Sequence, residues 1–528
     1  MTVADLIDGF AAAKPNEAAV IYDPRVITYA ALSDMGKRAA QGLQDLGVGP
    51  GDRVAFWLPN CPAYLALYLG CCRLGAIAVA VNTRYRSGEV SDIMGRSGAK
   101  ILAMWPRFRH IDFLGLLEDV DSVALERLET LILYNEGEQG ALPPASVQHC
   151  RVVNADDVLA RPPLVENLAG SETGSNIFTT SGTTSAPKFV LHGQGGIARH
   201  ARTVADYFGY SEPNGALLQM LPLCGVFGFV QMMAGLASGQ PTVLTSSFDP
   251  VAAINLAARH NVVNFNATDD MIQAILNASD AERPMPNLRF VGSAAFATNY
   301  AELATLAESR GIPMTGLYGM SEVQALFSLQ PMHLPLLDRI AGGGAMASDK
   351  AQARVRDPDS GALLPPGQAG ELELKGPSLM LGYYNNPDAT ADAFTDDGFL
   401  RTGDLGEMCC DGRFIFLQRM GDVLRLGGFL VSPAEIEAHL QTHPDVAGCQ
   451  VVGVRTEAGD KPVGFVIPAP GADFNEESLR QYCLDSLARF KAPVRLFPLD
   501  EFPTTKSANG FKIQRAALRD MAATRMGG

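Results

Sequence analysis

A run of small, hydroxyl-bearing residues ends in a lysine in the first half of the chain. The run reads Thr179-Thr180-Ser181-Gly182-Thr183-Thr184-Ser185-Ala186-Pro187-Lys188. Hydroxyls and backbone N–H groups can bind phosphate oxygens, glycine permits close backbone approach, and lysine adds a positive charge. The spacing does not fit a Walker A loop. On composition alone, a polyphosphate-binding loop and a polar surface turn are both open.

A second stretch places an aromatic residue, glycines and an acid close together. It reads Thr315-Gly316-Leu317-Tyr318-Gly319-Met320-Ser321-Glu322. An aromatic ring beside glycine can stack on a flat base, and a nearby glutamate can hold a hard cation through oxygen. Taken alone, the stretch favours a buried strand followed by a helix that Ser321 caps.

A third stretch, Leu400-Arg401-Thr402-Gly403-Asp404-Leu405-Gly406, places a carboxylate after glycine at the end of a strand. Such a carboxylate can accept hydrogen bonds from both hydroxyls of a ribose. The alternative is an ordinary Gly-Asp turn.

Taken in order, these stretches resemble the signature motifs of the adenylate-forming superfamily of acyl-CoA synthetases, adenylation domains and luciferases. The first is similar to T-S-G-T-T-G-x-P-K-G, with Ser185 and Phe189 replacing two glycines. The second is similar to Y-G-x-T-E, with serine for threonine. The third is similar to T-G-D, and the upstream segment 382–387 (Gly-Tyr-Tyr-Asn-Asn-Pro) also matches.

Two further segments carry the resemblance. Gly292-Ser293-Ala294-Ala295 is a partial match to the adenine-side G-G-A-P segment. Residues 419–429, Arg-Met-Gly-Asp-Val-Leu-Arg-Leu-Gly-Gly-Phe, resemble the hinge between the large and small domains. The hinge position aligns with Gly421, where glycine makes rotation sterically easy. A β-hairpin with Gly-Gly at its turn is compatible with this interpretation.

The last match is near the C-terminus, where the family has P-x-T-x-x-G-K-I-x-R. Lys512-Ile513-Gln514-Arg515 fits its ending, although Phe511 separates Gly510 from the lysine. The family's lysine contacts the substrate carboxylate and the α-phosphate, so Lys512 is the expected catalytic lysine and Lys506 the alternative.

The resemblance assigns a role to each matching position. Tyr318 flanks the adenine, Ser321 contacts the α-phosphate, Asp404 and Arg419 bind the ribose, and Glu322 positions Mg²⁺. The expected catalytic residues are Lys512, Thr184 and Glu322. The expected nucleotide- and CoA-binding residues are Thr180, Ser181, Gly182, Thr183, Thr184, Lys188, Ser293, Ala294, Ala295, Tyr318, Gly319, Met320, Ser321, Asp404, Arg419, Gly427 and Gly428.

The implied reaction has two steps: a carboxylic acid reacts with Mg-ATP to give acyl-AMP, and the acyl group then passes to coenzyme A. An amine or a separate carrier protein is the alternative acceptor, and a non-enzymatic nucleotide-binding regulator is the alternative from another class. Gly225 stands where the family often has a histidine that gates the acyl pocket, which favours either a bulky apolar acid (fatty, alicyclic or aromatic) or a gate built from other residues. Candidate pocket residues are Phe227, Phe229, Met232, Met271, Ala295 and Met320.

Hydrophobic periodicity predicts an α/β fold. Strand-helix-strand patterns recur from residue 26 to residue 81 and from 218 to 291, which implies parallel strands covered by helices. Short alternating strands follow around 351–374. The resemblance implies a large N-terminal domain, 1–420, of two α/β/α layered subdomains plus a β subdomain. A small, mobile α+β domain, 421–528, is expected to carry Lys512.

Composition narrows the function classes. The net charge is −15, so the chain lacks the excess of basic residues that is typical of nucleic-acid-binding proteins. Nine scattered cysteines suggest reduced thiols, and the first residues do not resemble a signal peptide, so a cytoplasmic location is expected. Residues 213–248 carry no charge, but prolines and glycines favour a buried strand-helix-strand unit over a membrane span. A homodimer is a candidate assembly.

Overall fold

The structure is a computed structural model that describes most of the chain. It forms two compact units, residues 1–352 with 375–400 and residues 353–374 with 401–528. The predicted division between residues 420 and 421 stays a prediction. The described ranges are 1–135, 144–179, 188–294, 300–420, 424–426, 429–431, 433–456, 459–487, 491–507 and 510–526.

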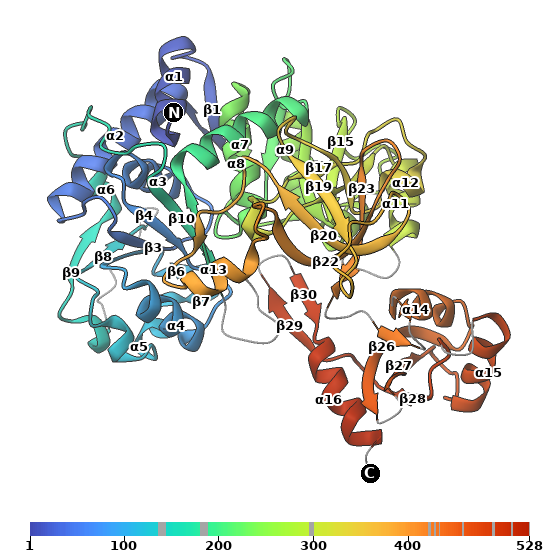
Figure 1. Ribbon diagram of the computed structural model, residues 1–528. Helices are drawn as coiled ribbons and strands as arrows, with labels where there is room; N and C mark the ends of the chain where they lie inside the picture. The colour runs from blue at the N-terminus through green and yellow to red at the C-terminus, as the bar shows by residue number, and fades with distance from the viewer. Residues whose placement is uncertain are drawn as a thin grey trace. The chain divides into compact units, whose positions relative to one another are not determined.

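The first unit contains a mainly parallel sheet in the order β21-β11-β10-β4-β3-β5-β8-β9 (Figure 1). β10–β11 and β11–β21 pair antiparallel. The strands are β3 (Arg53–Trp57), β4 (Ile77–Ala80), β5 (Ile101–Met104), β8 (Thr130–Leu133), β9 (Arg151–Asn154), β10 (Gly174–Thr179), β11 (Phe189–Gly193) and β21 (Gly382–Tyr383).

A second run of strands in this unit has the order β18-β17-β16-β15-β14-β12-β13-β1-β2, and its centre is parallel. The strands are β1 (Ala18–Tyr22), β2 (Arg25–Thr28), β12 (Ala216–Gln219), β13 (Thr242–Leu244), β14 (Val262–Thr268), β15 (Phe290–Ala294), β16 (Met314–Tyr318), β17 (Ser328–Leu329) and β18 (Gly343–Met346).

Helices cover both faces of these sheets and create the hydrophobic cores. The central core joins both sheets through α1, α2, α3, α7 and α8, and two outer cores lie beneath α4–α5 and α9–α11. The prediction of two α/β/α layered subdomains is therefore confirmed. The helices are α1 (Val3–Ala13), α2 (Tyr29–Asp45), α3 (Pro62–Leu74), α4 (Ser87–Ser97), α5 (Phe113–Glu118), α6 (Ala155–Leu159), α7 (Gln194–Tyr207), α8 (Val226–Ser238), α9 (Pro250–Arg259), α10 (Asp269–Asn277), α11 (Tyr300–Ser309), α12 (Leu336–Arg339) and α13 (Pro387–Ala393).

The uncharged segment 213–248 forms the buried unit β12-α8-β13, as predicted. Helix α8 is buried along nearly its whole length, because strands and helices surround it. A Cβ at Gly228 would lie 2.4 Å from the Pro222 carbonyl oxygen, so the small residue permits this packing. In the part of the chain that the structure describes, every helix is too short or too polar to cross a membrane.

In its described residues, the second unit is built from small sheets and three helices. One run of strands has the order β19-β20-β22-β23, a second sheet is β26-β27-β28, and β24–β25 and β29–β30 are antiparallel hairpins. The elements are β19 (Gln352–Arg356), β20 (Ala369–Lys375), β22 (Leu400–Met408), β23 (Phe414–Arg419), β24 (Leu424–Leu426), β25 (Phe429–Val431), α14 (Pro433–Gln441), β26 (Val446–Thr456), β27 (Gly459–Pro468), α15 (Glu476–Ser486), β28 (Arg495–Pro498), β29 (Thr504–Ser507), β30 (Gly510–Ile513) and α16 (Arg515–Met526).

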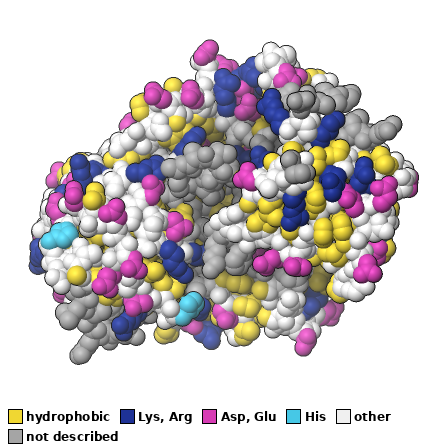
Figure 2. All heavy atoms as spheres, turned by 90° about the horizontal axis from the view of Figure 1, so that it is seen from below, with side chains coloured by type: hydrophobic (Ala, Val, Ile, Leu, Met, Phe, Trp, Pro, Cys, Tyr) yellow, Lys and Arg dark blue, Asp and Glu magenta, His cyan; other side chains and the backbone are white. Residues whose placement is uncertain are grey.

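Charged side chains of both signs share the surface. On the face shown in Figure 2, Lys and Arg side chains are interspersed with Asp and Glu.

Candidate active site

The residues expected on the adenine side lie at the carboxyl ends of parallel strands. Ser293 and Ala294 end β15, and Tyr318 ends the adjacent parallel strand β16. In open α/β sheets this edge is where ligands bind. Ala295 lies outside the described residues.

Close packing requires the glycines on either side of Tyr318. A Cβ at Gly316 would lie 2.0 Å from the Ala341 carbonyl oxygen, and one at Gly319 would lie 2.5 Å from the Ala325 Cα. A single 3₁₀ turn follows, Ser321–Val323, in which Met320 rather than Ser321 occupies the cap position. Met320 is half-buried beside the Tyr318 hydroxyl.

Glu322 is a buried carboxylate with a tyrosine partner. Only 6% of the residue is exposed, and its Oε1 accepts a 2.9 Å hydrogen bond from the hydroxyl of Tyr383. Its backbone carbonyl accepts a 2.8 Å hydrogen bond from the N–H of Met380. Backbone and carboxylate are therefore both held by the segment that leads into β21.

Lys188 reaches the same tyrosine from another direction. Its Nζ lies 4.5 Å from the centroid of the Tyr383 ring, within cation–π distance. Tyr383 thus contacts the last residue of the hydroxyl-rich run and the glutamate of the Tyr-Gly segment. Residues 180–187, which include Thr180, Ser181, Gly182, Thr183 and Thr184, lie outside the described residues.

Two buried histidines hold the turn that carries Glu322. His192 on β11 lies 2.7 Å through Nε2 from the Ser321 carbonyl oxygen, and His200 on α7 lies 2.9 Å from that of Ala325. Burial lowers the pKa of both imidazoles to about 4. Both rings are therefore neutral at pH 7, and Nε2–H donates to the carbonyl in each case. Sequence analysis missed them; the only signal was a histidine in the apolar strand Phe-Val-Leu-His.

Asp404 and Arg419 form a pair in the second unit. Arg419 Nη1 lies 3.0 Å from Asp404 Oδ1 and donates to the Thr402 carbonyl at 3.0 Å. The Thr402 hydroxyl donates to Leu372 and accepts from the Asp404 N–H, while Gly403 takes a left-handed φ of 67°. These contacts fix the turn that presents Asp404, and its binding of ribose stays a prediction.

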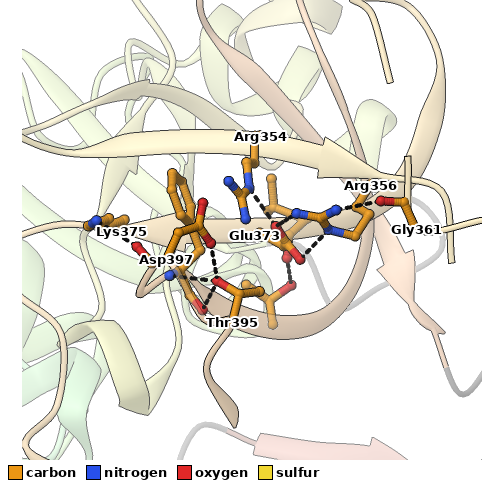
Figure 3. Close-up of polar contacts among 10 residues, drawn as sticks. Arg354, Arg356, Gly361, Glu373, Lys375, Thr395 and Asp397 are labelled. Carbon is orange, nitrogen blue, oxygen red and sulfur yellow. Dashed lines mark hydrogen bonds and ion pairs between the residues drawn. The ribbon is translucent and has the colours of Figure 1, made fainter. Parts of the chain in front are cut away.

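A buried ion-pair cluster supports the strand beside this turn (Figure 3). The carboxylate of Glu373 on β20 is fully buried and contacts Arg354 at 2.5 Å and Arg356 at 2.8 Å. On the same strand, burial raises the pKa of Glu371, and a hydrogen bond from the Gly403 backbone opposes that effect. The two arginines therefore compensate the charge of Glu373 next to the Asp404 turn.

The expected catalytic lysine lies on a β-hairpin. The backbone of Lys512 pairs with Thr505, and that of Lys506 pairs with Phe511, so these residues form strands β29 and β30. The side chains of both lysines lie outside the description, as do Gly421, Gly427 and Gly428. The strands on either side of Gly427 and Gly428 pair as the antiparallel hairpin that the sequence predicted.

Comparison with known proteins decides the family. The model of the AMP-binding enzyme family matches residues 7–384, and that of the AMP-binding enzyme C-terminal domain matches residues 435–509. The chain belongs to the AMP-binding enzyme family. The resemblance to the adenylate-forming superfamily and the expectation of an enzyme of the acyl-CoA synthetase class are thereby confirmed.

Relatives of this AMP-binding enzyme align along most of their length. It is 28% identical to oxalate–CoA ligase of Arabidopsis thaliana, with 97% of each chain covered. It is 27% identical to 4-coumarate–CoA ligase 3 of Oryza sativa subsp. japonica, with 93% of this chain and 86% of the relative covered. Its fold matches ATP-bound MatB of Rhodopseudomonas palustris with a TM-score of 0.82 and 25% identity, covering 99% of each chain.

The residues of this AMP-binding enzyme fit a magnesium ion that arrives with a nucleotide. Mg²⁺ in such sites is commonly held by one or two carboxylates, water and substrate phosphates. Glu322 supplies one buried carboxylate of this kind. Among the described residues, no group of three or more His, Cys, Asp or Glu side chains could hold a metal by itself. Phosphate oxygens would therefore be needed to complete the site.

The candidate pocket residues divide into core and non-core positions. Phe229 stacks edge-on against Tyr68 and Phe178, at 5.1 and 5.2 Å between ring centroids, and Met232 is fully buried, so both are core residues. Phe227 is also buried, near the start of α8. Met271 is half-buried between two cores. Met271 and Met320 are thus the more exposed of the described candidates.

Proposed function

We propose that this enzyme is an acid–CoA ligase that activates a carboxylic acid as acyl-AMP and transfers the acyl group to coenzyme A. The observation that carries the proposal is the meeting of Lys188 and Glu322 at Tyr383. A positive group from the hydroxyl-rich run and a hard oxygen ligand from the Tyr-Gly segment are what a bound polyphosphate and its cation require. Relatives named as 4-coumarate–CoA ligase, oxalate–CoA ligase and a putative acyl-CoA synthetase support the general reaction.

In the first step, a carboxylate oxygen of the acid attacks the α-phosphorus of ATP, a P–O bond forms, and pyrophosphate leaves. Such a reaction depends on in-line positioning and on neutralisation of negative charge. Lys512 serves the carboxylate and the α-phosphate, and Lys188 and Thr184 serve the leaving phosphates. Asp404 and Arg419 bind the ribose, and Tyr318 flanks the adenine. Magnesium, when bound, supplies charge neutralisation on the phosphates.

In the second step, the thiol of coenzyme A attacks the acyl carbonyl, a thioester forms, and AMP leaves. This step requires Lys512 to withdraw, and Gly421 supplies a backbone position that permits rotation. Gly427 and Gly428 then line the path of the thiol. No protein nucleophile takes part in this scheme.

The acid that fits best is apolar, in the aromatic, alicyclic or fatty class. Segment 213–248, which includes the expected acyl-pocket wall at Gly225, contains no charged side chain. A second carboxylate on the acid would need a cation to offset its desolvation. Apolar burial provides the binding free energy instead, at about 0.8 kcal/mol per CH₂ group.

The test is acid-dependent exchange of radioactive pyrophosphate into ATP over a panel of short, medium and long fatty acids, benzoate-like acids, alicyclic acids and oxalate. Thioester formation with coenzyme A follows on the best acid. Exchange with an apolar acid and then a thioester is expected. Exchange followed only by an amide in the presence of amines would make the enzyme an amide ligase. Absence of exchange with every acid would contradict the proposal.

A further inference from the structure

We propose that Tyr383 is a positioning residue for the nucleotide's metal ion, because it fixes the carboxylate of Glu322 and seats the ammonium of Lys188. This inference rests on the proposed function. It adds a residue whose hydroxyl and ring have separate tasks at the site.

The hydroxyl acts on Glu322. It donates a 2.9 Å hydrogen bond to Oε1 of a carboxylate that is buried away from water. An ionised carboxylate can accept about four hydrogen bonds, so this contact selects one side-chain orientation while leaving capacity for a cation. A neutral donor orients the carboxylate without cancelling its negative charge. Groups that orient metal ligands in this way affect metal affinity although they do not touch the metal.

The ring acts on Lys188. The Nζ atom of this lysine lies 4.5 Å from the ring centroid, where the aromatic face attracts a cation. The lysine ends the hydroxyl-rich run and directly precedes β11. Tyr383 therefore limits the positions of the ammonium at the point where the chain leaves the run.

The backbone of Tyr383 is itself held firmly. It pairs with Val190 of β11, and its N–H donates a 2.9 Å hydrogen bond to the Thr390 hydroxyl. The preceding residue, Gly382, has a φ of 149°, and a Cβ there would lie 2.9 Å from the Thr390 side chain. Because these contacts hold the backbone of Tyr383, removal of the hydroxyl should change the orientation of the Glu322 carboxylate more than the position of strand β21.

The adjacent Tyr384 provides a matched control. It is also partly buried, and it packs against the outer core beneath α4 and α5. Tyr384→Phe removes the same hydroxyl group from a neighbouring position that has no assigned part in the site. Tyr383→Phe keeps the ring for Lys188 and removes only the hydroxyl, while Tyr383→Leu removes both.

The experiment is equilibrium binding of a non-hydrolysable ATP analogue by calorimetry, with and without Mg²⁺, on the full-length chain. We expect Tyr383→Phe to raise the Mg²⁺ concentration for half-maximal tight binding about tenfold. We expect its affinity for the metal-free nucleotide to match that of the wild type. Tyr383→Leu should in addition weaken metal-free binding about threefold, since Lys188 loses its aromatic contact. Tyr384→Phe should reproduce the wild-type Mg²⁺ dependence.

Three results would overturn the inference. One is an unchanged Mg²⁺ dependence in Tyr383→Phe, and another is a loss of affinity that is equal with and without the metal, as general loosening would produce. In both cases the wild type still binds Mg-nucleotide, so the proposed function stands. If the wild type shows no metal-dependent nucleotide binding, the inference and the proposed function fail together.

Discussion

The guanidinium of Arg515 lies 2.9 Å from both carboxylate oxygens of Glu437 and joins the segment after the lysine hairpin to helix α14. Glu437 also accepts a 2.7 Å hydrogen bond from the Val451 N–H, and Arg515 donates to the Val451 carbonyl at 3.1 Å. The Gln514 N–H donates to the Pro503 carbonyl and closes the base of the hairpin. Lys512 precedes Arg515 by three residues. The position of Lys512 therefore depends on the contact between Arg515 and Glu437.

We expect Glu437→Gln to slow acyl-AMP formation about tenfold, because a hydrogen bond between charged groups contributes about 1.5–3 kcal/mol. The measurement is pyrophosphate exchange at saturating ATP and acid. Glu476→Gln is the control, since Glu476 pairs with Arg495 at the same 2.9 Å distance but away from the hairpin. Equal slowing in both variants would show that Glu437 contributes only general stability.

Because His192 and His200 are neutral in the folded protein, we predict that the free energy of unfolding falls at acidic pH. Burial lowers the pKa of His192 and His200 to about 4 in the folded state, against about 6.5 in the unfolded chain. Between these values the unfolded state binds more protons, so stability falls as pH falls from about 6.5 towards 4. The His192→Gln variant keeps an N–H donor but has no imidazole to protonate. We therefore expect the free energy of unfolding of this variant to fall by about 1.5 kcal/mol less than that of the wild type between pH 6.5 and 5. The measurement is the melting temperature of each protein between pH 6.5 and 5. If the melting temperatures of the variant and the wild type fall by the same amount, the prediction is wrong.

The Asp404–Arg419 pair predicts a defect in ATP binding. Asp404→Asn keeps the side-chain volume but removes the charge that faces Arg419 and the expected ribose hydroxyls. We expect KM for ATP to rise about tenfold or more in pyrophosphate exchange. Asp411, an exposed residue that pairs with Arg413 at the tip of the β22–β23 hairpin, is the control, and Asp411→Asn should change KM less than about twofold. A wild-type KM in Asp404→Asn would remove its ribose role.

A larger residue in place of Gly316, in the middle of β16, is predicted to clash with the neighbouring backbone. A Cβ at Gly316 would lie 2.0 Å from a backbone oxygen, which cannot move without shifting the chain at Ala341. We expect Gly316→Ala to lower the melting temperature and to weaken nucleotide binding, at a cost of about 2 kcal/mol. Gly9→Ala in α1, where a Cβ meets open space, should instead stabilise the chain by about 0.5–1 kcal/mol. Wild-type melting in Gly316→Ala would contradict the packing argument.

Sequence patterns predicted helices and strands well where apolar periodicity was clear. Helix α3 and strand β13 lie within the strand-helix-strand regions predicted at 26–81 and 218–291, because apolar periodicity marks both regions. Ser321 was predicted as a possible helix cap, but the structure places Met320 there. The difference arises because only one 3₁₀ turn forms, and residues 324–326 then adopt left-handed backbone angles that periodicity does not indicate.

The sequence by itself determined the family, the order of the motifs and the acidic, largely apolar character of the chain, because these depend on residue type and spacing. Tertiary structure alone decided which distant residues meet: His192 with Ser321, Tyr383 with Glu322 and Lys188, and Arg515 with Glu437. The residues that meet in each of these contacts are far apart in the sequence and lie on different elements. Sheet order and helix packing bring them together, and neither is encoded in local spacing.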